Sequence, residues 1–270
     1  MCRRRIECVA GTTILVLHLL SASSASCQEA TEAVWAIGDD RVRVVFPVSV
    51  PDSGLAQVVL AAARSSRTIR GLPAGSLGEG RISVVVGSSF PSALDAVAST
   101  RGRTVILPLD RLGAWSTEKL QRVLRHEFAH IALGSHLGLS RQPIWFSEGY
   151  SEWAAGGLTC EGHVRISVAL MERDAGDANR WPSLSPDRRE RLAYDLFTTF
   201  FEYLEMRRPG VVEGGKLILA LKEQELNEVL SSLMGAGLAE LEGGWRSWVR
   251  ARFRSAPPLS LRCGSDLPMS

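Results

Sequence analysis

The chain has 270 residues, of which 45% are hydrophobic and 22% charged. This composition is typical of a globular protein, and the length suits one domain with two lobes. The formal net charge is +2, and the three arginines and one glutamate among the first seven residues contribute that much by themselves. The remaining chain is therefore nearly neutral, and nothing in this charge balance suggests a nucleic-acid-binding protein.

Residues 1–26 have the pattern of an export signal. Arg3 to Arg5 precede an apolar stretch from Val9 to Leu20, and the small residues Ser21 to Ser26 follow. This order is typical of a secretory signal peptide, and the apolar stretch is too short to span a bilayer. Cleavage after Ala25 fits the small-residue rule, with a retained membrane anchor as the alternative. We therefore expect an exported protein, periplasmic or extracellular.

The cysteines agree with export. Cys2 and Cys8 leave with the signal, so three cysteines remain in the mature chain. Cys27 follows small residues in a way that faintly resembles a bacterial lipoprotein site, although Ser24 stands where such a site has leucine. A lipid anchor at Cys27 is therefore an alternative to a freely exported protein. Cys160 and Cys263 are the predicted disulfide pair, with free thiols as the alternative.

The first part of the mature chain predicts a small mixed sheet. Val-rich and apolar runs predict strands at Arg41 to Val48, Arg81 to Gly87 and Thr104 to Leu109, and a helix runs from Asp52 or Ser53 to about Arg70. Pro108 has no backbone N–H to donate, which indicates that Thr104 to Leu109 is an edge strand.

The segment His126 to His130 (HEFAH) carries the strongest chemical signal. It lies in a predicted helix that begins at Ser116 or Thr117 and ends near Leu133, before Gly134. Histidines four residues apart share one helix face, so both imidazoles can reach a single zinc ion. Glu127 is placed to act as general base toward a water that the metal activates. A buried core histidine is the alternative for either one alone, but the pair favours a metal.

A third ligand is expected from the next helix, predicted from Ile144 to Ala155. Glu148 lies on it, 18 residues after His130. Glu152 follows one turn later on the same face and could accept the outer ring N–H of a ligand histidine as a second-shell contact. The alternative for Glu152 is a solvated side chain.

The run Trp145 to Trp153 (WFSEGYSEW) resembles the segment that supplies the glutamate ligand in gluzincin zinc metallopeptidases. The resemblance is to the peptidase MA-like family, related to aminopeptidase N and leukotriene hydrolase. It implies one zinc ion held by His126, His130 and Glu148, with Glu127 as general base. The helical segment Tyr194 to Phe201 (YDLFTTFF) is similar to the family segment whose tyrosine stabilises the transition state, which implies a catalytic role for Tyr194.

The same resemblance implies an α+β, zincin-like fold. A small mixed-sheet N-terminal lobe with an edge strand would be followed by a mostly helical C-terminal lobe, with the zinc cleft between them. The metallopeptidase domain would span 27–255, with lobes at about 34–133 and 134–255 and a loosely ordered tail at 256–270. Beyond an irregular stretch from Thr159 to Trp181, we expect a helix from Ser185-Pro186 to about Arg208 and two or three helices between Val211 and Phe253.

The predicted function is an exported zinc metallopeptidase that acts on peptides or proteins, with no nucleic-acid partner. An extended substrate would pair with the edge strand that precedes the HExxH helix. The exopeptidase motif of the aminopeptidases (Gly-x-Met-Glu-Asn) is missing ahead of that helix, so endopeptidase specificity stays open. The alternatives are a non-catalytic binding domain with the same fold, and a zinc amidase or esterase with a non-protein substrate. The sequence predicts nothing about oligomeric state.

Overall fold

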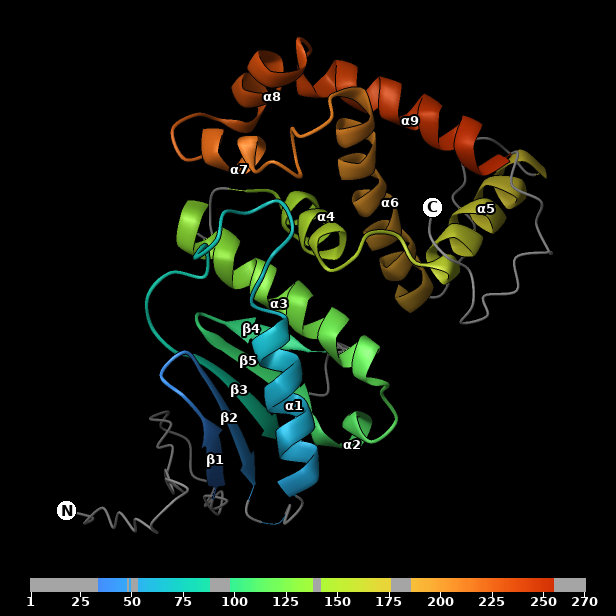
Figure 1. Ribbon diagram of the computed structural model, residues 1–270. Helices are drawn as coiled ribbons and strands as arrows, with labels where there is room; N and C mark the ends of the chain where they lie inside the picture. The colour runs from blue at the N-terminus through green and yellow to red at the C-terminus, as the bar shows by residue number, and fades with distance from the viewer. Residues whose placement is uncertain are drawn as a thin grey trace, which may run out of the picture. The chain divides into compact units, whose positions relative to one another are not determined.

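The computed structural model describes residues 34–47, 49, 53–87, 98–137, 142–175 and 186–254. Within these residues there are five strands and nine helices (Figure 1). The chain divides into two compact units, the first within Met1–Thr68 and Leu77–Ile131, the second within Ile69–Ser76 and Ala132–Ser270. The predicted export signal (1–26), Cys27, Cys263 and the predicted tail (256–270) lie outside the described residues.

A five-stranded mixed sheet in the order β1-β2-β3-β5-β4 forms the base of the first unit (Figure 1). The strands are β1 (Val34–Gly38), β2 (Val42–Pro47), β3 (Ile82–Gly87), β4 (Ser99–Arg101) and β5 (Thr104–Pro108). β2, β3 and β5 run parallel, whereas β1 and β4 are antiparallel to their neighbours. The three parallel strands are the three that the sequence predicts. β1 and β4 were not predicted, because runs of five and three residues carry little periodicity.

The prediction that Thr104 to Leu109 is an edge strand is wrong. β5 lies between β3 and β4 and pairs with both, so β4 is the outer strand on this side. Pro108 is the last residue of β5, and β4 pairs with β5 only as far as Ile106. The missing N–H of Pro108 therefore costs no hydrogen bond to β4. A proline at the end of a strand therefore does not indicate whether that strand pairs on one edge or on both edges.

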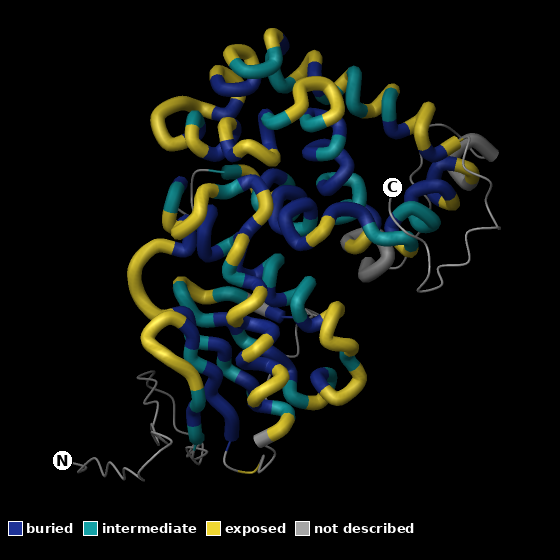
Figure 2. The backbone as a smooth tube through the Cα atoms, in the orientation of Figure 1, coloured by how far each residue is buried: buried dark blue, intermediate teal, exposed yellow. Residues whose placement is uncertain are grey.

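Helix α1 (Ser53–Ser65) packs on β1 and β2 (Figure 1). Its buried face consists of small and branched residues, and Val59 and Ala63 are completely buried. Along β3, buried and half-buried positions alternate (Figure 2). The helix ends earlier than predicted, because the hydroxyls of Ser65 and Ser66 donate to the Ala62 carbonyl. The Ser66 hydroxyl also donates to the Gln121 carbonyl of helix α3.

Helix α2 (Leu109–Leu112) is a single turn after β5, and helix α3 (Thr117–Leu137) follows. α3 begins where the sequence predicts, with the Ser116 hydroxyl accepting a hydrogen bond from the Lys119 N–H. It does not end before Gly134, as predicted, but continues to Leu137. A glycine inside a helix costs only about 1 kcal/mol, which neighbouring packing readily offsets.

The described part of the second unit contains the Ile69–Ser76 segment, the end of α3 and six further helices. These are α4 (Ile144–Ala154), α5 (Cys160–Ala175), α6 (Pro186–Arg207), α7 (Lys216–Ala220), α8 (Leu226–Met234) and α9 (Leu238–Arg254). α4, α6 and the three short-to-medium helices after Val211 agree with the predictions. The prediction of an irregular stretch from Thr159 to Trp181 is wrong over Cys160–Ala175, which forms helix α5. Its Ile166 and Leu170, one turn apart, are buried in one cluster with Leu192 of α6 and Phe253 of α9.

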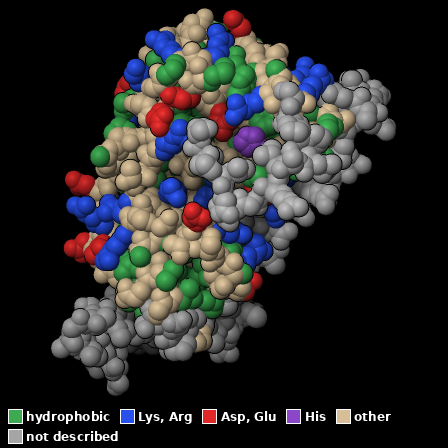
Figure 3. Space-filling model, turned by 45° about the vertical axis from the view of Figure 1, so that its right-hand side comes forward, with side chains coloured by type: hydrophobic (Ala, Val, Ile, Leu, Met, Phe, Trp, Pro, Cys, Tyr) green, Lys and Arg blue, Asp and Glu red, His purple; other side chains and the backbone are tan. Residues whose placement is uncertain are grey.

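Charged side chains of both signs lie interspersed over the described part of the face shown in Figure 3. Exposed ion pairs such as Arg64–Asp39 and Arg81–Asp40 occur in the first unit. Among the described helices, none is long and apolar enough to cross a membrane. Cys160 is disulfide-bonded. Every other cysteine lies outside the described residues, so pairing with Cys263 stays a prediction.

Candidate metal centre

Helix α3 places the two motif histidines side by side. Leu124 and Phe128, one turn apart, are completely buried and fix the inner face of the helix. His126 and His130 are half-buried. Their rings meet edge to face at a centroid distance of 4.7 Å, and their Nε2 atoms are 3.1 Å apart. Both nitrogens therefore point toward one place, as the i, i+4 spacing predicts.

Glu148 of α4 completes a cluster with these histidines. Each of the three residues offers one ligand atom, and these atoms all lie within 4.8 Å of one another. Zinc bonds of about 2.0–2.2 Å in a tetrahedron separate ligand atoms by roughly 3.3–3.6 Å. The 3.1 Å between the histidine nitrogens is close to that spacing. Two imidazoles and one carboxylate are also a zinc donor set that leaves a fourth position open. The residues present fit zinc.

Glu127 is buried beside the cluster, with only 6% of its surface exposed. The hydroxyl of Thr100 on β4 donates to its carboxylate oxygen Oε2 and lies 3.4 Å from its backbone carbonyl oxygen. Sequence analysis missed Thr100. β4 is only three residues long, and no motif links a threonine to a glutamate 27 residues later.

α4 presents Glu148 from a helix whose other side is deeply buried. It begins after Pro143, whose carbonyl accepts hydrogen bonds from the N–H groups of Phe146 and Ser147. Phe146, Tyr150 and Trp153 follow at helical spacing and are at most 1% exposed. Rings of Phe146 and Tyr150 contact Phe201 of α6 edge to face at 5.2 and 5.6 Å. Glu148 and Glu152 lie on the half-buried side.

The Tyr150 hydroxyl, although close to Glu148 in sequence, has a structural role. It donates to the Arg70 carbonyl at 3.1 Å. Burial strongly raises the pKa of this phenol, so it stays protonated at neutral pH. The guanidinium of Arg70 lies 4.2 Å from the ring centre of Trp153. These contacts fasten the Ile69–Ser76 segment to α4.

The predicted roles of Glu152 and Tyr194 stay predictions. Glu152 is half-buried and is among the acidic groups near Arg165 of α5. The pKa of that guanidinium is raised mainly by its hydrogen bonds to Asp195 and further by the charge of Glu152. Tyr194 is half-buried on α6, its ring 6.4 Å from that of Phe197.

His136 is half-buried near the end of α3. Burial is the main cause that lowers the pKa of its imidazole, and the positive charge of Lys222 lowers it further. It belongs to no metal-ligand cluster among the described residues.

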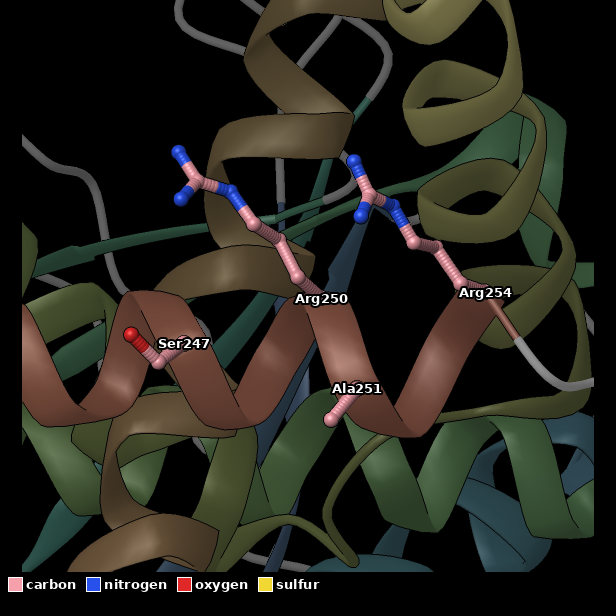
Figure 4. A pocket seen from close by; sticks show the side chains of 4 residues that line it. All are labelled: Ser247, Arg250, Ala251 and Arg254. Carbon is pink, nitrogen blue, oxygen red and sulfur yellow. The ribbon is translucent and has the colours of Figure 1, made fainter.

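One cavity of about 460 Å³ lies on α9 and is lined by Ser247, Arg250, Ala251 and Arg254. Figure 4 shows the two arginine side chains extending from the same side of the helix. None of the predicted site residues lines this cavity. The candidate site is therefore defined by the ligand cluster and not by this hollow.

No protein-family model matches the chain, and no curated protein matches it. Similar solved structures include the M1 zinc metallopeptidase from Deinococcus radiodurans and a mutant of it, at 17% and 16% sequence identity. Each comparison covers 87% of this chain and 52% of the solved chain, with a TM-score of 0.43. The chain thus spans about half the length of those peptidases. A likeness at this level carries no argument about function, which rests on the site itself.

Proposed function

We propose that this chain is a zinc-dependent metallopeptidase. The observation that carries the proposal is the gathering of the His126, His130 and Glu148 ligand atoms within 4.8 Å of one another. Glu127, the side chain next to the first ligand, is buried at the same place on α3. A purely structural zinc site usually has four protein ligands, whereas a catalytic one has three and an open position. Three ligands with an adjacent carboxylate favour catalysis.

When bound, zinc would supply a Lewis acid that lowers the pKa of a coordinated water and polarises the scissile carbonyl. The chain's own residues would do the rest. Glu127 would accept a proton from the attacking water and donate it to the leaving amine. Tyr194 would donate its hydroxyl to the oxygen that gains negative charge. Glu152 would orient a ligand histidine through the outer ring N–H.

The outer side of β4 is where we expect an extended peptide to bind. Within the described residues, β4 pairs only with β5, so its other edge carries backbone groups that no strand uses. A peptide chain can add to such an edge by backbone hydrogen bonding. Thr100 of the same strand contacts Glu127, which brings this edge next to the proposed general base. The sequence predicted a substrate-binding edge here but assigned it to β5.

Export remains part of the proposal. The pattern of residues 1–26 supports secretion, and Cys27 supports a lipid anchor as a variant of it. The disulfide at Cys160 is compatible with an oxidising compartment.

The test is the metal content of the purified mature protein, compared with Glu148→Ala. We expect one zinc per chain in the wild type and its loss in the variant. Glu240→Ala, an exposed glutamate of α9, is the matched control and should keep the metal. A well-folded wild type without zinc would contradict the proposal and leave a binding domain. A protein that binds zinc, cleaves no peptide in a library screen and hydrolyses amides or esters would be a zinc amidase or esterase with a non-protein substrate.

A further inference from the structure

We propose that Thr100 is a positioning residue for Glu127, an inference that rests on the proposed peptidase function. Its hydroxyl would hold the carboxylate in the one orientation from which it can take the proton of the attacking water. The residue comes from a strand, whereas its partner belongs to the HExxH helix. A single side-chain contact thus joins the outer strand to the proposed catalytic base.

The contact has the geometry of an orienting bond. The Thr100 hydroxyl donates to Oε2 of Glu127 and also lies 3.4 Å from the Glu127 backbone oxygen. It therefore contacts both ends of the glutamate and limits rotation of the side chain. Because Glu127 is only 6% exposed, solvent offers few competing donors. A hydrogen bond to a buried carboxylate is stronger than one in water.

Thr100 is itself held firmly. β4 and β5 form a hairpin in which Thr100 pairs with Val105, a completely buried residue. The connection is Gly102 and Arg103, and Gly102 has φ +59°, the left-handed conformation that two-residue hairpin turns require. Threonine is also branched at Cβ, which restricts its χ1 and so fixes the direction of the hydroxyl.

Arg103 fastens the turn of this hairpin. Its guanidinium donates to the carbonyls of Leu77 and Gly80 at 2.6 Å each and to that of Arg81 at 3.4 Å. Three backbone acceptors on one side chain fix the turn to the loop before β3. The position of Thr100 therefore depends on a rigid strand and not on a mobile loop.

This arrangement gives the two carboxylate oxygens different tasks. Oε2 accepts the hydrogen bond from Thr100, and Oε1 accepts the proton of the attacking water as the new carbon–oxygen bond forms. The same proton then passes to the leaving nitrogen as the carbon–nitrogen bond breaks. No proton is exchanged with Thr100, so its contribution is orientation alone.

The experiment compares Thr100→Val, which removes the hydroxyl at nearly constant shape, with Thr100→Ser, which keeps it. Zinc content, kcat and KM are measured on a peptide that the wild type cleaves. We expect unchanged zinc, an unchanged KM and a fall in kcat of about 10- to 100-fold for Thr100→Val. Thr100→Ser should restore kcat to within several-fold of the wild type. Thr104→Val, the same change at the cross-strand neighbour of Arg101 on β5, is the control and should leave kcat unchanged.

A second readout needs no activity. In metal-free protein, thermal unfolding is measured for Thr100→Val, Glu127→Gln and the double variant. We expect the Thr100→Val loss in melting temperature to shrink once Glu127 is replaced, because the two residues form one interaction. Additive losses would overturn the inference.

Other outcomes also decide. Full kcat in Thr100→Val would overturn the positioning role and leave the proposed function intact. Thr100→Ser as slow as Thr100→Val, or an equal loss in Thr104→Val, would show that strand packing matters and the hydroxyl does not, which also overturns it. A wild type that binds zinc and cleaves no peptide would reject the proposed function and this inference together.

Discussion

Gly149 lies directly against the backbone of Phe197. A Cβ at Gly149 would come within 2.7 Å of the Phe197 carbonyl oxygen and 2.8 Å of its carbonyl carbon. Helices α4 and α6 can approach this closely only because one of them has no side chain at the contact. This glycine immediately follows Glu148. The proposed metal ligand is therefore followed by a residue that must lack a side chain for α4 and α6 to pack. A glycine directly after Glu148 thus has a physical reason within this chain.

Gly149→Ala should therefore destabilise the second unit. The added methyl meets backbone atoms, which cannot turn aside, and we expect a loss of about 1–3 kcal/mol in the free energy of unfolding. Gly243→Ala on α9 is the control, since a Cβ there meets nothing within 4 Å. That change should be neutral or stabilise by up to about 1 kcal/mol. Thermal and urea unfolding measure both, and equal effects at the two positions would contradict the packing argument.

Tyr194→Phe should lower kcat by about 100- to 1,000-fold with zinc content unchanged, if its hydroxyl stabilises the developing negative charge. Tyr203→Phe on the same helix is the matched control. Its hydroxyl accepts a hydrogen bond from Arg207 at 3.2 Å, a local contact with no proposed chemical role. Steady-state kinetics on a cleaved peptide separates the two. If Tyr194→Phe retains full kcat, the tyrosine is a packing residue.

Removing the metal should lower stability in a way that depends on the three ligands. A ligand that binds only the folded state adds about 2.7 kcal/mol when its free concentration is 100 times Kd. We expect a chelator to lower the melting temperature of the wild type and to leave that of His130→Ala unchanged. Scanning calorimetry with and without added zinc measures this. An equal response of both proteins would place the zinc elsewhere.

The environment of the Asp39 carboxylate predicts that the free energy of unfolding changes with pH. Backbone N–H groups of Val42 and Arg41 donate to its carboxylate, and the Arg64 guanidinium adds to them, so its pKa is lowered to about 2. The folded protein therefore favours the charged form of Asp39. This stabilisation is complete above the unfolded pKa of about 3.9 and is lost as pH falls toward about 2.

Asp39→Asn should accordingly be less stable than the wild type near neutral pH, and the difference should shrink as the solution is acidified. Urea unfolding of both proteins across this pH range is the measurement. A constant difference at every pH would mean that the charge of Asp39 does not matter for folding.

The disulfide at Cys160 yields a last prediction. If Cys263 is the partner, Cys160→Ser and Cys263→Ser should each cost about 2–5 kcal/mol of stability, and the double variant should cost no more than either. Peptide mapping without reduction identifies the linked pair directly. A Cys263→Ser variant with wild-type stability would exclude this pairing.

Several features followed from the sequence because they depend on local periodicity. Backbone hydrogen bonding fixes 3.6 residues per helical turn, so the spacing of His126 and His130 sets their shared face before any tertiary contact forms. The same reasoning predicted the helix that carries Glu148 and the three parallel strands. Helix ends were less predictable: Gly134 does not stop α3, and two serine hydroxyls shorten α1.

Tertiary structure alone decided which distant segments meet. No spacing rule brings Glu148 to the histidines, 18 residues away from His130, and only the resemblance of its segment to gluzincins predicted that they meet. Nothing in the sequence predicted Thr100 beside Glu127. The place of β5 within the sheet was likewise decided by pairing, since it pairs with a strand on each edge, which Pro108 at its end did not reveal. α5 is helical because its apolar face packs against α6 and α9 in one buried cluster. Sequence fixes local geometry through the backbone, whereas non-local pairing depends on which buried surfaces the whole chain can cover.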